Sequence, residues 1–185
     1  KARAEEYPAL QKRRAVAHGD EFERVMAEIA AHLDQSLDLH DMMALIMRGM
    51  HEGIGMERVV FALMAADRTS VRAKYVIGAE EGDPLRQFQF SMTNVNLFAK
   101  LMERVQGIWV RRANRGQLAG LLTPEIEAMT GGEDFFAMSV FVHGKPVGLF
   151  YADRKGNPFA LTEKNYLDFK SLCLRAAEGL AHLAR

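Results

Sequence analysis

A single cysteine, Cys173, occurs among the 185 residues, so the chain cannot form an internal disulfide. A lone thiol is typical of proteins in reducing compartments, and we expect a cytoplasmic location. A chain of this length buries about 70% of the surface that its unfolded form exposes. It therefore needs no covalent cross-link to hold a hydrophobic core.

Neither sign of charge is in excess, because Lys plus Arg and Asp plus Glu each number 24. Such a chain has no overall field that would favour nucleic acid or an anionic membrane. The longest apolar runs have the length of a strand, far below the roughly 20 residues of a membrane-spanning helix. We expect no nucleic-acid partner and no membrane anchor, and no signal peptide is visible.

Side-chain groupings that could support catalysis or bind a metal are also missing. The 6 histidines are scattered. His40 and His51, on one expected helix, stand about 16 Å apart, which is too far to share an ion. Paired carboxylates and a nucleophile beside a base are absent from the pattern. We predict a non-enzymatic protein with no catalytic residues, no metal and no cofactor.

Two amphipathic helices are expected near the start. Asp20 begins the first, with an acid three residues later to complete the cap. A stripe at helical spacing follows it: Phe22, Met26, Ile29, Leu33 and Leu37. Asp38 caps the second helix, which Gly53 and Gly55 end.

Residues 1–19 are interpreted as a linker, or as an incoming helix from an upstream module. The chain opens with Lys1 rather than Met, so we expect it to be a piece of a longer protein. Residues 20–185 are predicted to form one domain.

Strands and short helices follow the two entry helices. Residues 58–65 are apolar on both faces, whereas residues 71–77 alternate and should lie near a sheet edge. Further short elements are predicted: strands at 88–90 and 108–110, and helices at 96–105 and after Thr123-Pro124.

The most informative passage is FFAMSVFVHGKPVGLFYADR, residues 135–154. Two strand-length runs meet at a turn that we place at Gly144-Lys145, where glycine supplies a positive φ. Pro146 has no N–H to donate and is expected at the start of the second strand. Each run is apolar on both faces, so protein must cover both sides of this hairpin.

A long helix closes the chain after Leu161-Thr162. Its apolar residues recur at alternating spacings of three and four, the pattern of a coiled-coil seam: Tyr166, Phe169, Cys173, Ala176, Leu180 and Leu183. A seam within one chain and a seam between two chains both fit this pattern.

Together these elements predict an α+β domain with an antiparallel sheet. The terminal helices would cover one face. The irregular segment at about 79–134, a lid of loops and short helices, would cover the other. A sheet covered in this way can enclose a small-molecule pocket.

Three passages resemble the GAF domain family: ERVVFALM at 57–64, MSVFVHGKPVGLFYADR at 138–154, and LTEKNYLDFKSLCLRAAEGL at 161–180. The resemblance covers the chain from Asp20 to Arg185, and is greatest to GAF domains that follow HDOD modules in bacterial regulatory proteins. It implies a GAF-like sheet of five or six antiparallel strands, a pocket on one face, and a homodimer through the terminal helices. It also implies an upstream domain, an HDOD module, in the same chain.

Residues that mark particular ligands in that family are absent. Where cyclic-nucleotide binders carry Asn-Lys and Phe-x-x-x-Asp-Glu, this chain has Asp153-Arg154 (or Ala152-Asp153) and LTEKNY at 161–166. Cys173 lies on the helical seam, where a thiol behaves as a small apolar group rather than a tetrapyrrole attachment site. One cysteine also cannot both attack and resolve, as GAF-type methionine sulfoxide reductases require.

The pocket predicted from strand position is lined by Phe90, Phe98, Trp109, Phe136 and Met138, with Arg111 as its polar anchor. Arginine binds carboxylate or phosphate through a bidentate fork. Arg111 belongs to a local excess of positive charge, which a solvated loop also explains: Lys100, Arg104, Arg111, Arg112 and Arg115.

Two functions fit this sequence. One is a non-catalytic sensory or regulatory domain of a bacterial signal-transduction protein that binds an unidentified small molecule, mediates dimerisation, or does both. The alternative is a ligand-free homodimerisation module whose pocket is filled by its own side chains.

Overall fold

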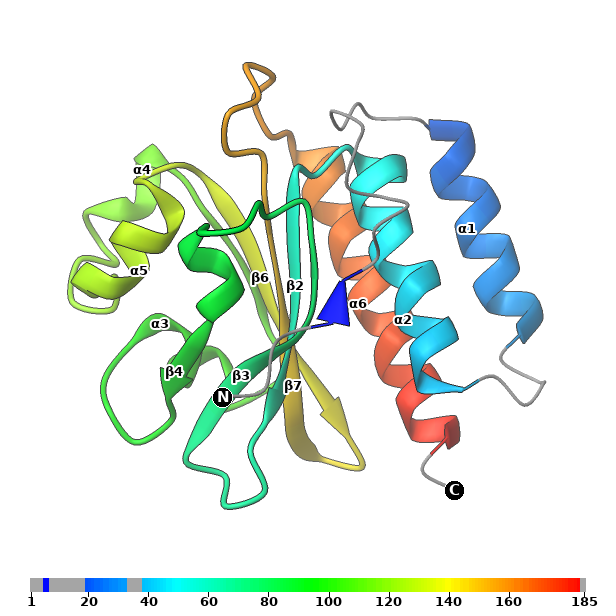
Figure 1. Cartoon of the computed structure of the whole chain (residues 1–185), viewed down its shortest axis with the longest axis horizontal. Helices are drawn as coiled ribbons and strands as arrows, with labels where there is room; N and C mark the ends of the chain where they lie inside the picture. The colour runs from blue at the N-terminus through cyan, green and yellow to red at the C-terminus, as the bar shows by residue number, and fades with distance from the viewer. Residues whose placement is uncertain (1–4, 7–18, 33–37, 184–185) are drawn as a thin grey trace.

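The computed structural model describes residues 5–6, 19–32 and 38–183. A sheet lies between a layer of long helices and a layer of short helices and loops (Figure 1). The helical elements are α1 (Gly19–His32), α2 (Leu39–Arg48), η2 (Gly49–Ile54), η3 (Pro84–Gln87), α3 (Leu97–Leu101), α4 (Arg112–Arg115), α5 (Pro124–Thr130) and α6 (Glu163–Leu183). The strands are β1 (Glu5–Glu6), β2 (Arg58–Met64), β3 (Ser70–Ile77), β4 (Gln89–Ser91), β5 (Gly107–Val110), β6 (Phe135–Val142) and β7 (Lys145–Asp153).

The strands form a 7-stranded sheet in the order β1-β3-β2-β7-β6-β5, with β4 pairing with β3 beside that path. Strands β2 to β7 pair antiparallel, as predicted, and β1 adds a parallel pair on β3. The two long hairpins meet at the centre, where β2 pairs with β7 from Arg58 opposite Asp153 to Leu63 opposite Gly148. This register places the first residue of β2 opposite the last residue of β7.

The β6–β7 hairpin is covered on both faces, as predicted, because every residue at 135–140 is buried. Its turn is His143-Gly144, with φ of 50° and 77°, which is the geometry of a primed two-residue turn. The turn predicted at Gly144-Lys145 is one residue late, since Lys145 already pairs with Val142 in the ladder. Histidine adopts a positive φ more readily than most residues, so the turn does not require glycine at both positions.

Side-chain caps fix the starts of several helices. Asp38 accepts a bond of 2.8 Å from the N–H of Asp41 at the start of α2. At α6, Thr162 and Asn165 cap one another through bonds of 3.1 Å and 3.0 Å. The cap predicted at Asp20 is different, because α1 begins at Gly19 and Asp20 lies within its first turn.

The second entry helix ends at Gly55, one of the two glycines predicted to end it, whereas Gly53 lies within its last turn. After Arg48, α2 continues into the π-helical turn η2, which ends at Gly55 with a φ of 85°. Of the first predicted apolar stripe, Phe22 is buried and packs into the core. Leu33 and Leu37 of that stripe lie outside the described residues, as does most of the expected linker at 1–19.

The sheet separates two hydrophobic cores. The helix-side core lies between the sheet and α1, α2 and α6, and includes Phe136, Phe150 and Phe169. The lid-side core lies between the sheet and the segment from η3 to α5, and includes Phe135 and Tyr151. Adjacent residues such as Phe135 and Phe136 enter different cores because successive side chains of a strand point to opposite faces.

The apolar stripe of α6 packs within this chain. Phe169, Cys173 and Ala176 are buried in the helix-side core. Tyr166 and Leu180 pack against the same core, whereas Leu183 at the helix end is 38% exposed. The seam that the sequence left open is therefore intramolecular along most of its length.

Candidate functional site

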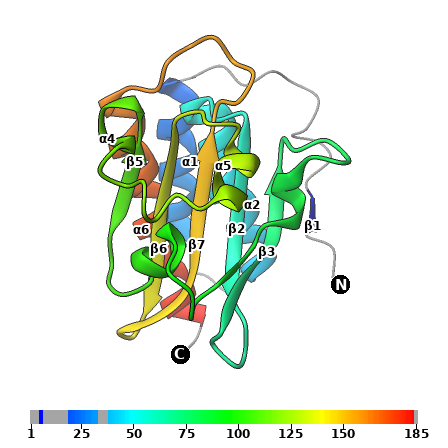
Figure 2. The ribbon, with the colours of Figure 1, turned by 90° about the vertical axis from the view of Figure 1, so that its left-hand side faces the viewer.

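The candidate site is the lid-side core, where the sequence predicts a pocket. Its floor is the lid face of the sheet, including Val60 and Tyr151, and its roof is built from short helices. Leu85 of η3, Phe98 of α3 and Ile126 of α5 all point into it and are buried. Figure 2 shows the sheet from this side, with α3 and α5 lying across it.

Five aromatic rings, which we call the aromatic cluster, fill much of this interior: Phe88, Phe90, Phe98, Phe135 and Tyr151. Phe88 contacts Phe90 and Phe98 at ring-centroid distances of 4.9 Å and 5.0 Å. The Phe90 and Phe98 ring centroids are 4.8 Å apart, and the Phe135 ring lies tilted beside Tyr151 at 5.1 Å. Four of the five rings are at most 1% exposed, Phe90 being the exception. The site is therefore a packed aromatic interior under a closed lid.

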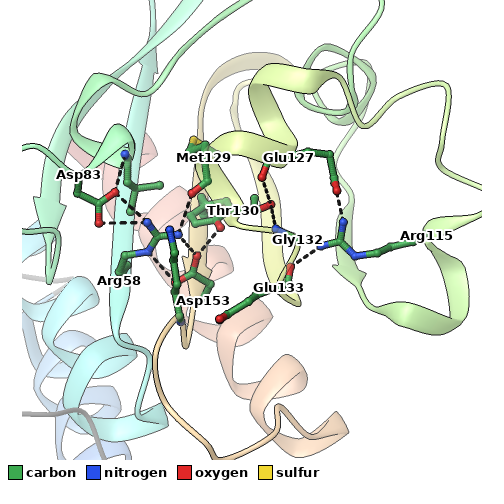
Figure 3. Close-up of polar contacts among 12 residues, drawn as sticks. Arg58, Asp83, Arg115, Glu127, Met129, Thr130, Gly132, Glu133 and Asp153 are labelled. Carbon is green, nitrogen blue, oxygen red and sulfur yellow. Dashed lines mark hydrogen bonds and ion pairs between the residues drawn. The ribbon is translucent and has the colours of Figure 1, made fainter.

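A buried polar group, which we call the Arg58 network, lies at one end of this interior (Figure 3). It consists of Arg58, Asp83, Met129, Tyr151 and Asp153. The guanidinium of Arg58 donates to both carboxylate oxygens of Asp153, at 2.9 Å for Nε to Oδ1, and also to the Met129 carbonyl at 3.1 Å. Its Nη1 donates to Asp83 at 2.9 Å, and the Tyr151 hydroxyl donates to Asp153 at 2.5 Å.

The two main charges of this network are shielded from water. The side chains of Arg58 and Asp153 are 4% and 0% exposed. Burial alone would disfavour the charge on Arg58, but hydrogen bonding and attraction to Asp153 outweigh it and raise the pKa of Arg58. Burial, followed by the Asp153 charge, raises the pKa of Tyr151 well above its ordinary value. The phenol therefore stays protonated and donates to the carboxylate.

The network joins the sheet to its lid. Arg58 begins β2 and Asp153 ends β7, whereas Asp83 precedes η3 and Met129 lies in α5. One guanidinium thus holds two sheet strands and two segments of the lid together. Buried ion pairs add little net stability but are costly to break, so this geometry favours a single closed arrangement.

A second ion pair holds the outer part of the lid. Arg115 of α4 donates to the Glu127 carboxylate of α5 and to the Glu133 carbonyl, each at 2.5 Å (Figure 3). Arg115 was predicted only as part of a basic excess. The structure gives it a definite role in fastening α4 to α5.

The six predicted pocket residues do not line one pocket. Phe90 and Phe98 lie on the lid side, as expected. Trp109, Phe136 and Met138 lie on the helix side, where Trp109 meets Phe136 edge-on at 5.8 Å. This part of the prediction was wrong because alternation tells which residues share a face, but not which layer covers that face.

Arg111, the predicted polar anchor, also lies away from the lid-side interior. Its guanidinium stacks over the Trp109 ring, 4.2 Å from the centroid. It therefore follows Trp109 to the margin of the sheet rather than pointing into the aromatic cluster.

Arg58 and Asp153 were missed, although the sequence carries a clue to both. They flank apolar strands, at the start of ERVVFALM and the end of GLFYADR. A charge attached to a strand buried on both faces must be paired, because an unpaired buried charge is costly. The two residues are 95 positions apart, so only the strand pairing identifies them as partners.

Among the residues that the structure describes, no group of three or more His, Cys, Asp or Glu side chains could hold a metal ion. Cys173 is buried, and burial raises the pKa of its thiol well above the ordinary value. It therefore remains a neutral, unreactive thiol at neutral pH. In the same described ranges, no helix is both long and apolar enough to cross a membrane.

No protein-family model and no curated protein matches the sequence. Solved structures do match. A segment of a methyl-accepting chemotaxis protein, residues 122 to 287, superposes with a TM-score of 0.66 at 18% identity, covering 87% of this chain and 98% of that one. A GAF domain/HD domain protein from Geobacter sulfurreducens gives a TM-score of 0.64 at 14% identity, covering 82% and 97%.

A third structure is the phycoerythrobilin-bound GAF domain of a cyanobacterial phytochrome, with a TM-score of 0.59 at 16% identity, covering 87% of this chain and 95% of that one. These likenesses extend over nearly the whole of each neighbour, 95–98% of its length. The chain has the α+β fold of a GAF domain.

Proposed function

We propose that this chain is a non-catalytic regulatory domain of a bacterial cytoplasmic signalling protein, and that its lid-side interior holds side chains in place of a ligand. The aromatic cluster is the observation that carries this proposal. Phe88, Phe98, Phe135 and Tyr151 occupy, at no more than 1% exposure, the space between sheet and lid. The structural neighbours include a segment of a methyl-accepting chemotaxis protein and a GAF domain of a phytochrome. We assign this chain a regulatory role by analogy with such proteins.

Ligand screening by thermal unfolding tests this proposal. A ligand present at 100 times its dissociation constant would stabilise the fold by about 2.7 kcal/mol. Cyclic nucleotides, organic acids and bilins should all leave the unfolding temperature unchanged. A reproducible rise with any of them would contradict a filled interior.

We also propose that the domain forms a homodimer through the outer face of α6. Leu167 and Leu174 are 51% and 48% exposed there, and a spacing of seven places both on one side of a helix. Sedimentation should show a dimer for the parent chain and a monomer for Leu167→Glu/Leu174→Glu. Val95→Glu/Val105→Glu, which alters two exposed apolar residues outside this helix, is the matched control and should stay dimeric. A parent chain that sediments as a monomer would remove the dimer from the proposal.

An upstream module, which we propose to be an HDOD domain, would supply the output. One structural neighbour is a protein that combines a GAF domain with an HD domain. Sequencing the reading frame upstream of Lys1 tests this directly, and an unrelated upstream module would contradict it.

Small-molecule sensing is the second candidate, and the Arg58 network favours it. Its polar groups come from two sheet strands and two lid segments, so displacement of Asp83 or Met129 would free the lid from the sheet. A ligand can drive that change only by its greater affinity for the open arrangement. Asp83→Asn weakens the attachment of the lid. Under this candidate, a compound in the thermal screen should therefore raise the unfolding temperature of the variant more than that of the parent chain. Equal shifts in the two proteins would exclude sensing through this lid.

A further inference from the structure

A group of aromatic and basic side chains lies on the helix side of the sheet, at its β5 margin. We call it the β5 edge site: Trp109, Arg111, Tyr166 and Lys170. The Trp109 and Tyr166 rings lie 6.2 Å apart. The Arg111 guanidinium covers Trp109 at 4.2 Å, and the Lys170 ammonium covers Tyr166 at 4.5 Å.

The local sequence explains this arrangement. Alternate residues of a strand share a face, so Gly107, Trp109 and Arg111 all face α6. Gly107 leaves room for the helix: a Cβ at that position would lie 3.0 Å from the Tyr166 hydroxyl and 3.4 Å from Cδ of Lys170. One turn of α6 separates Tyr166 from Lys170, which places both against the same strand.

The cations of this site have no acidic partners. Within residues 5–6, 19–32 and 38–183, no carboxylate lies within 4.0 Å of Arg111 or Lys170, nor of Arg104 or Arg112 beside them. Other cations nearby are paired, for example Lys164 with Asp168 at 2.7 Å. The indole Nε1 of Trp109 is also buried without an acceptor. In this described part of the chain, the site thus presents positive charge that no carboxylate neutralises.

The backbone of β5 is open on the same margin. Among the described residues β5 pairs only with β6, and the Gln106 carbonyl accepts from the N–H of Ser139 in β6 at 3.1 Å. Because successive peptide groups of a strand alternate in direction, Gly107 and Trp109 turn theirs away from β6. The Asn114 side chain occupies part of this edge, since it donates to the Trp109 carbonyl at 2.8 Å. The N–H and carbonyl of Gly107 and the N–H of Trp109 are left without partners in the described chain. Figure 2 shows β5 at the margin of the sheet, with α6 behind it.

We propose that the β5 edge site docks an acidic, extended segment of a partner protein, which adds to β5 as a further strand. Such a segment offers backbone groups to the open edge and places carboxylates at alternate positions toward Arg111 and Lys170. The cations are already held against aromatic rings, so little of their freedom is lost when they bind. Arginine adds a bidentate fork for a carboxylate.

A polypeptide fits this site better than a nucleic acid. Single-stranded nucleic acid binds by stacking bases on open aromatic faces. Here Arg111 covers Trp109 and Lys170 covers Tyr166. Charged side chains on an edge strand can also serve only to prevent aggregation, in which case no segment binds. The experiment separates these outcomes.

Trp109 is the one tryptophan of the chain, so its fluorescence reports directly on the site. The probe is a short fluorescein-labelled peptide of alternating Glu and Val, measured by anisotropy and, unlabelled, by Trp109 emission. We expect saturable binding that weakens as salt is added. The same peptide with Lys in place of Glu should not bind. Absence of saturable binding, or equal binding of oligouridine or inorganic phosphate, would overturn the proposal.

Arg111→Gln/Lys170→Gln should weaken binding of the acidic peptide by about tenfold or more, as expected for the loss of two charge-assisted contacts. Lys164→Gln/Arg175→Gln is the matched control, since it removes the same charge from cations that already have acidic partners. It should leave the affinity within about twofold. An equal loss in both variants would indicate attraction by overall charge and overturn a defined site. Thermal unfolding of both variants verifies that they are folded. The test is independent of the lid-side interior, which lies on the other face of the sheet.

Discussion

Asp153→Asn is the sharpest test of the Arg58 network, because it removes one negative charge and almost no volume. The Asp153 carboxylate accepts from Arg58 Nε at 2.9 Å, from the Tyr151 hydroxyl at 2.5 Å and from the Lys155 N–H at 3.1 Å. It also accepts from Nη2 of Arg58. An asparagine keeps one acceptor for Arg58 Nε and Lys155, but its NH₂ group then faces Nη2 of Arg58, which is also a donor.

The expected cost follows from the burial of the stranded cation. Arg58 is only 4% exposed, and the remaining carboxylate, Asp83, contacts a different nitrogen of its guanidinium. Removing one partner of a buried ion pair costs about 3–5 kcal/mol of unfolding free energy. Asp83→Asn should cost less, about 1–2 kcal/mol, because the Asp83 side chain is 17% exposed and water can replace part of its contacts.

Urea unfolding, followed by circular dichroism and by Trp109 fluorescence, measures these differences. In the Asp153→Asn background, Arg58→Met should recover stability, since it removes the stranded charge. A loss below about 1 kcal/mol for Asp153→Asn would refute this account of the network. So would an equal loss for Asp83→Asn, because the difference between the two depends on burial.

Three further predictions concern the core. Phe98→Ala should lower the unfolding free energy by about 3–5 kcal/mol and open an apolar cavity that binds benzene; a variant that unfolds with the parent's urea midpoint would contradict tight packing of the aromatic cluster. Gly148→Ala should cost about 1–3 kcal/mol, because its Cβ would lie 2.3 Å from the Ala62 carbonyl oxygen; an unchanged melting temperature would show that the strands can separate freely. For Cys173, burial raises the folded-state pKa above the ordinary 9.0, so above that pH the unfolded chain loses its proton first and stability falls by about 1.4 kcal/mol per pH unit. Cys173→Ala should remove this part of the alkaline loss in urea titrations at rising pH, and identical pH profiles would contradict a thiol that stays protonated in the fold.

The fold could be predicted from local patterns. The caps at Asp38 and Thr162 are local chemistry, and both appear where the sequence places them. The hairpin at 135–154 has strands apolar on both faces, which require two covering layers. These features depend on residues close together in the chain, and the physical rules that govern them act at that range.

The site could be predicted only in part, because it depends on pairings between distant segments. The faces of β6 follow from alternation, yet nothing local tells whether Phe135 or Phe136 meets the lid. Arg58 and Asp153 become neighbours only through the β2–β7 register. The one-residue error at the hairpin turn arose because His143 takes a positive φ that the sequence rule assigns to glycine.

The separation of the interior into two cores has a practical consequence for protein engineering. Among the described residues, no side chain belongs to both the helix-side core and the lid-side core. Substitutions at well-separated sites without shared partners add independently. Replacing rings such as Phe88 and Phe98 with smaller side chains would therefore create a binding cavity on the lid side. The helix-side core would continue to stabilise the redesigned fold.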